Sequence, residues 1–157
     1  MNTVEEMLFG RYRQEELNDI FPFLSVEEMG LLFVYLELRE WQAGEIVLKK
    51  GDPADFMGFL VVGKLAVKME AIFPGRFILV AVLERGSMLG ELSVVEGGNR
   101  YATVVATENS HLLILSRKNM ELMLGQAPAL GLKIFQRIIS VLGHRLGEAS
   151  GRLARLL

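Results

Sequence analysis

The chain has 157 residues, of which 51% are hydrophobic, so its length and composition suit one globular domain with a full core. Cysteine is absent, which excludes disulfides, thiolate catalysis and cysteine-ligated metals. The net charge of −2 is too small for a general nucleic-acid binder. No long apolar run and no signal-peptide pattern occurs, so we expect no membrane span and a cytoplasmic protein.

The first part of the chain, residues 1–36, is expected to be helical. Residues 3–19 are polar with scattered apolar positions and predict one or two short helices. Ser25 and Glu28 have the spacing of a capping box, which predicts a helix from there to about residue 36. The residues expected on its apolar face are Met29, Leu32, Phe33 and Leu36.

In residues 37–116 the sequence pattern changes, and short β-rich runs alternate with glycine. This pattern is typical of an antiparallel sandwich or barrel. Ser116 is then placed to cap a short helix that ends near Leu124. The predicted strands lie near residues 38–42, 45–49, 57–62, 64–70, 77–83, 102–107 and 110–115.

A long final helix is predicted over residues 127–157, with Pro128 in its first turn. Its apolar residues follow a heptad seam, and a second apolar stripe turns into charged residues after Val141. We therefore expect the helix to pack on the barrel by two faces at first and then to leave it with only the seam, which would form a parallel homodimer. The alternative is that the seam covers its own barrel. The seam residues are Phe135, Ile139, Leu142, Leu146, Ala149, Leu153 and Leu156.

Charge is distributed unevenly, with acids concentrated in residues 1–40 and basic residues in 128–157. The basic helix could meet nucleic acid, or it could face the acidic helices of its own chain or of a partner subunit. The second interpretation is favoured because no aromatic residues are interleaved with the basic ones.

The stretch 90–103 combines residue types that suit a sugar phosphate. Gly90 permits a tight turn and close approach of a ligand, and residues 92–95 can form one helical turn whose N–H groups point towards an anion. Arg100 offers a planar fork for a phosphate, and Glu91 offers an acceptor for a sugar hydroxyl. The alternative is a surface turn in which Glu91 and Arg100 form a salt bridge.

The sequences Gly-Glu-Leu-Ser-Val at 90–94 and Arg-Tyr-Ala-Thr at 100–103 resemble the phosphate-binding cassette of the cyclic nucleotide-binding domain family. This family includes the catabolite activator protein and the regulatory subunits of cyclic-nucleotide-dependent kinases. The resemblance covers about residues 21–146. Two positions depart from the family pattern: Asn99 replaces a proline, and Tyr101 replaces a small residue, so that an inward ring would crowd the site. Further matching segments are 42–45, 51–55, 62–64 and 83–86.

The resemblance implies a mainly β fold with flanking helices: a double-stranded antiparallel β-helix (jelly-roll, cupin-like) with N-terminal helices and a long C-terminal helix. It implies an N-terminal helical segment (1–36), a β-roll (37–126) with the cassette at 90–103, and a lid or dimerisation helix (127–157). The lid would lie around residues 141–145. The implied ligand-binding residues are Gly90, Glu91, Leu92, Ser93, Arg100, Tyr101 and Ala102, with Val67, Val80 and Ala81 against the base or serving only as barrel core.

The function implied by the resemblance is a regulatory domain without catalysis that holds a cyclic nucleoside monophosphate, with cyclic AMP favoured and cyclic GMP next. We expect no cofactor or metal, no membrane contact and no DNA binding by this chain alone, and a downstream protein partner is left open. One alternative is a ligand-free dimerisation or scaffold module. The other, a small barrel enzyme, is disfavoured because His111 and His144 lack metal-ligand spacing and Ser93 is not in a hydrolase elbow.

Overall fold

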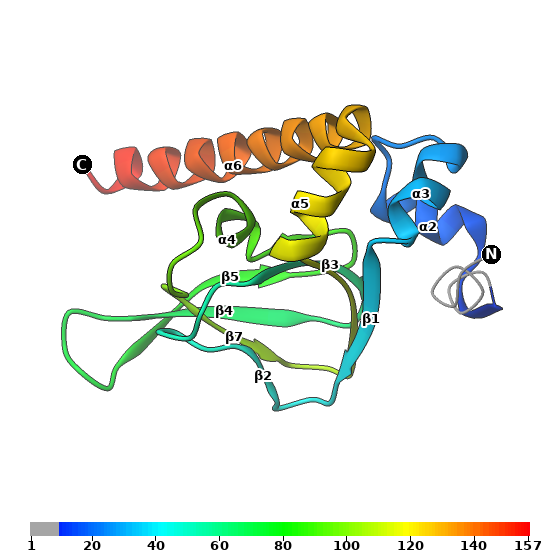
Figure 1. Cartoon of the computed structure of the whole chain (residues 1–157). Coiled ribbons are helices and arrows are strands. Elements are labelled where there is room, and N and C mark those ends of the chain that lie inside the picture. Colours follow the sequence, from blue (N-terminus) through cyan, green and yellow to red (C-terminus); the bar gives the residue numbers. More distant parts are fainter. Residues whose placement is uncertain (1–9) are drawn as a thin grey trace.

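The computed structural model describes residues 10–157, without the side chains of Ser93 and Val94 (Figure 1). The residues before Gly10, where part of the first helical prediction falls, lie outside the described part. The helices are α2 (Gln14–Ile20), α3 (Val26–Phe33), α4 (Glu91–Glu96), α5 (Arg117–Gln126) and α6 (Pro128–Leu156). The strands are β1 (Leu36–Trp41), β2 (Ile46–Leu48), β3 (Phe56–Val62), β4 (Leu65–Glu70), β5 (Phe77–Leu83), β6 (Met88–Leu89), β7 (Thr103–Ala106) and β8 (Ser110–Ser116).

The strands form two four-stranded antiparallel sheets, one in the order β1-β8-β3-β6 and the other in the order β2-β7-β4-β5. This arrangement confirms the predicted antiparallel fold and the β-roll that the resemblance implies. The short strand β6 was not predicted, because two residues are too few for a period-two pattern. Its residues pair with Gly58 and Phe59 of β3.

Two apolar clusters hold these layers together. One lies between the sheets and includes Leu60, Leu65 and Leu112. The other lies between the β1-β8-β3-β6 sheet and the helices, where Phe21 and Phe59 are almost fully buried. Since both clusters contain residues of β3 and β8, these two strands form the centre of the domain.

The capping box at α3 is confirmed. The Ser25 hydroxyl accepts the Glu28 N–H at 3.2 Å, and the Ser25 N–H donates to the Glu28 carboxylate at 2.9 Å. The predicted end of this helix is wrong, however, because α3 stops at Phe33 and Leu36 is the first residue of β1. Leu36 pairs with Leu115 of β8, so sheet pairing overrides the apolar spacing that continued the helix pattern.

The long helix α6 runs above the β-roll, with α4 between the helix and the sheets (Figure 1). The buried residues of α6 all belong to its first half: Leu130, Gly131, Ile134 and Ile138. Lys133 forms an ion pair with Glu28 at 2.6 Å, so the basic helix faces the acidic N-terminal part of its own chain here. Within residues 10–157, no helix combines the length and apolar character needed to cross a bilayer.

Candidate functional site

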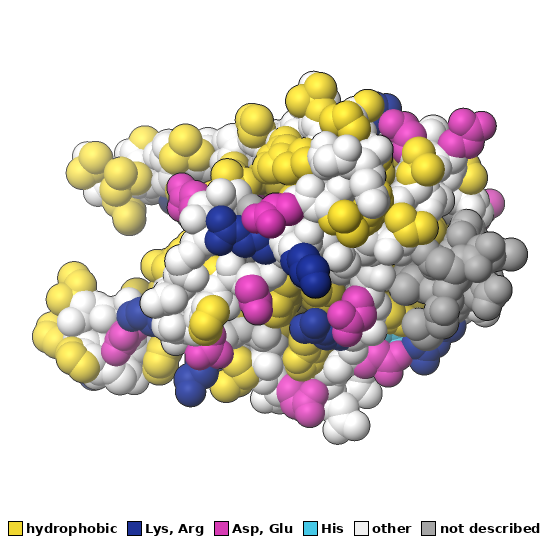
Figure 2. Space-filling model, in the orientation of Figure 1, with side chains coloured by type: hydrophobic (Ala, Val, Ile, Leu, Met, Phe, Trp, Pro, Cys, Tyr) yellow, Lys and Arg dark blue, Asp and Glu magenta, His cyan; other side chains and the backbone are white. Residues whose placement is uncertain are grey.

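A cavity of about 1060 Å³ lies between α6 and the β-roll. Its walls come from β4 and β5, from the stretch 85–92, from 96–102 and from α6 between Arg137 and Arg152. In Figure 2 the molecule is open between the C-terminal part of α6 and the β4–β5 hairpin. Nine of the ten predicted ligand-binding residues line this cavity: Val67, Val80, Ala81, Gly90, Glu91, Leu92, Arg100, Tyr101 and Ala102. The tenth is Ser93, whose side chain lies outside the described part of the structure.

Arg100 is a buried cation at the wall of this cavity, with 7% of its surface exposed. The backbone around it is fixed, because its N–H donates to the Asp52 carbonyl at 2.8 Å and its carbonyl accepts the Gly51 N–H at 2.7 Å. Burial lowers the pKa of the guanidinium below its ordinary value, and the carboxylates of Asp55 and Glu91 oppose this shift by favouring the charged form. A buried cation of this kind is suited to an anionic ligand.

Glu91, the first residue of α4, is buried with 3% of its surface exposed. Its carboxylate accepts a hydrogen bond from the guanidinium of Arg145 on α6. The same guanidinium donates to the Met88 carbonyl at 2.6 Å, so Arg145 joins α6 to both ends of the turn that precedes α4. The alternative of a surface turn for Glu91 and Arg100 is wrong, since both side chains are buried.

Gly90 has φ +68°, a conformation that favours glycine. This agrees with the tight turn predicted at this residue. A Cβ atom on this residue would lie 2.6 Å from Nη1 of Arg100 and 3.0 Å from the Phe56 carbonyl oxygen. Glycine is therefore needed both for the turn and for the close approach of the guanidinium. The helical turn predicted at residues 92–95 is present as part of α4.

Residues 38–127, more than half of the chain, match the family model of the cyclic nucleotide-binding domain. The chain belongs to this family. The resemblance found in the cassette sequence is therefore confirmed, and the β-roll described above is the family fold.

Known relatives agree with this assignment. The chain is 27% identical to the cyclic AMP receptor protein of Thermus thermophilus, over 83% of this chain and 58% of the relative. It is 26% identical to the cAMP-dependent protein kinase regulatory subunit of Dictyostelium discoideum, over 81% of this chain and 39% of that one. It thus spans less than two thirds of each relative. The crystal structure of a cyclic nucleotide-binding domain from Methylobacillus flagellatus shares the fold, with a TM-score of 0.83 and 24% identity. The match covers 91% of this chain and 85% of that one.

Tyr101 is the main departure of this cyclic nucleotide-binding domain from the family cassette, and the structure places most of its surface in solvent. The residue lines the cavity and is 60% exposed. Burial of the remaining surface raises the pKa of the phenol, as does the charge of Glu91. The effect of this side chain on ligand binding stays a prediction from the sequence.

Arg145 is a cavity residue whose contact with Glu91 the sequence did not predict. The lid was predicted around 141–145, and the structure brings Val141, His144 and Arg145 to the cavity together with residues further along α6. Nothing in the local sequence pairs Arg145 with Glu91, because the two residues lie 54 positions apart. The signal that could have found it is the position of Arg145 in the stripe where apolar residues give way to charged ones.

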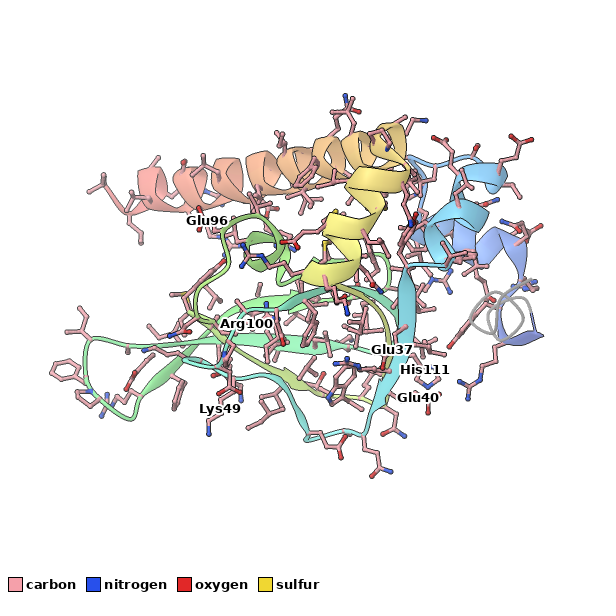
Figure 3. All side chains as sticks on the ribbon, viewed as in Figure 1. Glu37, Glu40, Lys49, Glu96, Arg100 and His111 are labelled. Atoms are coloured by element: carbon pink, nitrogen blue, oxygen red, sulfur yellow. The ribbon has the colours of Figure 1, made fainter. Side chains whose placement is uncertain are left out.

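The two histidines lie in unrelated surroundings. Tyr12 Oη and His111 Nδ1 are 2.5 Å apart, and His111 faces Glu40 at the β1 side of the domain, away from Arg100 (Figure 3). His144 is exposed on α6 and lies 3.5 Å from Glu148. Within residues 10–157, no three histidine or acidic side chains gather in a group that could hold a metal ion.

Proposed function

We propose that this domain binds a cyclic nucleoside monophosphate, with cyclic AMP as the first candidate and cyclic GMP as the second, and relays binding through α6. The observation that carries the proposal is the pair of oppositely charged, buried side chains, Arg100 and Glu91, at one cavity. The names of the Thermus and Dictyostelium relatives support cyclic AMP.

Each part of such a ligand has a chemically suitable partner. Arg100 and backbone N–H groups of the cassette would bind the phosphate, through charge-assisted hydrogen bonds of about 1.5–3 kcal/mol each. Glu91 would accept the ribose hydroxyl. The apolar side chains of Val67, Val80 and Ala81 would contact the base, since they line the cavity and retain exposed or partly exposed surface.

The relay through α6 is supported by the contact between Arg145 and Glu91. A ribose hydroxyl that donates to Glu91 would change the surroundings of a carboxylate already bonded to α6. The position of α6 would then differ between the empty and the occupied domain, to the extent that the ligand favours one position over the other.

The proposal is tested by calorimetric titration of the full chain with cyclic AMP, cyclic GMP and cyclic di-GMP, with adenosine and guanosine as phosphate-free controls. We expect binding of one cyclic mononucleotide and much weaker binding of its nucleoside, because the phosphate provides the charged contact. Absence of binding to all three cyclic nucleotides by a folded protein would reject the sensor proposal and leave the ligand-free module.

That second candidate, a dimerisation or scaffold module, is favoured by one observation on α6. Ile139, Leu146 and Leu153 recur every seven residues and are 68%, 69% and 60% exposed. Such a stripe suits the seam of a parallel homodimer. The seam is compatible with nucleotide binding, so the titration above, and not the oligomeric state, separates the two candidates.

Replacing Leu146 with glutamate is expected to convert a homodimer into a monomer, because it places a charge in the middle of the proposed apolar seam. Sedimentation velocity of the wild type and Leu146→Glu measures this directly. Leu122→Glu is the matched control, since Leu122 is 48% exposed on α5 and lies outside the seam. A monomeric wild type, or a Leu146→Glu variant that stays dimeric, would contradict the seam.

A further inference from the structure

Phe56, the first residue of β3, contacts Arg100 in two ways. Its carbonyl oxygen accepts a hydrogen bond from Arg100 Nη2 at 2.6 Å. Its ring centroid lies 4.7 Å from Arg100 Cζ, within the range of a cation–π interaction. One residue therefore fixes both the direction of the guanidinium and the plane beside which it lies.

The same ring also meets a second cation. Arg39 of β1 has its Cζ 5.3 Å from the Phe56 centroid. Its guanidinium is held by Glu37, with Nε–Oε1 at 3.0 Å and Nη2–Oε2 at 3.3 Å. Arg39 therefore lies beside the ring on the surface side, with its guanidinium directed by Glu37.

Two like charges at one ring require nearby negative charge. Glu37 supplies it to Arg39, and Asp55 favours the charged form of both Arg39 and Arg100. This negative charge allows both arginines to remain beside Phe56. The cluster extends from Glu37 at the outer surface to Arg100 at the cavity wall.

We propose that Phe56 is a positioning residue for Arg100, with Arg39 and Glu37 as its outer support. The inference rests on the proposed function, in which Arg100 binds the ligand phosphate. An arginine side chain loses much rotational freedom when it is fixed. Because Phe56 fixes Arg100 before the ligand arrives, part of this entropic cost no longer opposes binding.

The test is titration of the 157-residue chain with Phe56→Leu or Phe56→Tyr, using cyclic AMP, cyclic GMP and the corresponding nucleosides. Leucine keeps the backbone carbonyl and an apolar side chain but removes the ring. We expect about tenfold weaker binding of the cyclic nucleotide by Phe56→Leu, unchanged binding of the nucleoside, and affinity within about twofold of wild type for Phe56→Tyr. Arg39→Gln, a surface variant, is expected to bind the cyclic nucleotide about threefold more weakly than the wild type.

Phe73→Leu is the matched control, because Phe73 is 69% exposed and does not line the cavity. NMR spectra of the arginine Nε–Hε groups supply a second readout, since the ring-current shift of Arg100 should disappear in Phe56→Leu and persist in Phe73→Leu. Equal binding of the cyclic nucleotide by wild type and Phe56→Leu would overturn this inference alone. Failure of the wild type to bind any cyclic nucleotide would reject the proposed function, and this inference with it.

Discussion

Replacing Arg100 with alanine is expected to weaken cyclic-nucleotide binding by at least about a hundredfold. The guanidinium is buried at the cavity wall, and at least two charge-assisted hydrogen bonds to a phosphate, at about 1.5–3 kcal/mol each, would be lost. Nucleoside binding should change little, because the nucleoside has no phosphate. Calorimetry with both ligands measures the difference.

Two further variants sharpen this result. Arg100→Lys keeps the positive charge but not the planar fork, so we expect its affinity for the cyclic nucleotide to lie between the affinities of wild type and Arg100→Ala. Arg76→Ala, at an exposed arginine between β4 and β5, is the control for removal of a charge outside the cavity. If Arg100→Ala folds and binds the cyclic nucleotide as tightly as wild type, the phosphate assignment is wrong.

Gly90→Ala is expected to lower both stability and affinity. The left-handed backbone at φ +68° disfavours alanine, which gives a loss of about 1–3 kcal/mol in the free energy of unfolding. The new methyl would also lie 2.6 Å from Arg100 Nη1, so the guanidinium must move. We therefore expect at least about tenfold weaker binding, equivalent to about 1.4 kcal/mol.

The control for backbone strain is Gly75→Ala. Gly75 has φ +82° in the connection between β4 and β5, and a Cβ there would meet nothing within 4 Å. Both variants should lose stability in thermal unfolding, but only Gly90→Ala should lose nucleotide affinity. A Gly90→Ala variant with wild-type affinity would show that the position of Arg100 tolerates displacement.

Much of the fold follows from local patterns. The β-rich runs between glycines predicted seven of the eight strands found within residues 10–157, and the spacing of Ser25 and Glu28 predicted the start of α3. Both signals depend on residues close in the chain, where backbone preferences and side-chain capping act directly. The cassette could also be predicted from the sequence, because the turn at Gly90 and the charged residues Glu91 and Arg100 that follow it belong to one short stretch.

The remaining features depend on contacts between distant residues. The hydrogen bond of Arg145 to Glu91 joins residues 54 positions apart, and the place of Phe56 beside Arg100 joins residues 44 apart. No local periodicity specifies such pairs. Leu36 shows the opposite problem, since its helix-like spacing was real but pairing with β8 determined its conformation.

The bond between Arg145 and Glu91 also has a thermodynamic consequence for anything that acts on α6. Coupling between two binding events is reciprocal. If nucleotide binding weakens the hydrogen bond between Glu91 and Arg145, it raises the affinity of the domain for a protein that prefers the released helix. That protein must then raise the affinity for the nucleotide by the same factor. Nucleotide occupancy of the domain would then depend on the concentration of that protein as well as on that of the nucleotide. Both dependences would act through the carboxylate of Glu91.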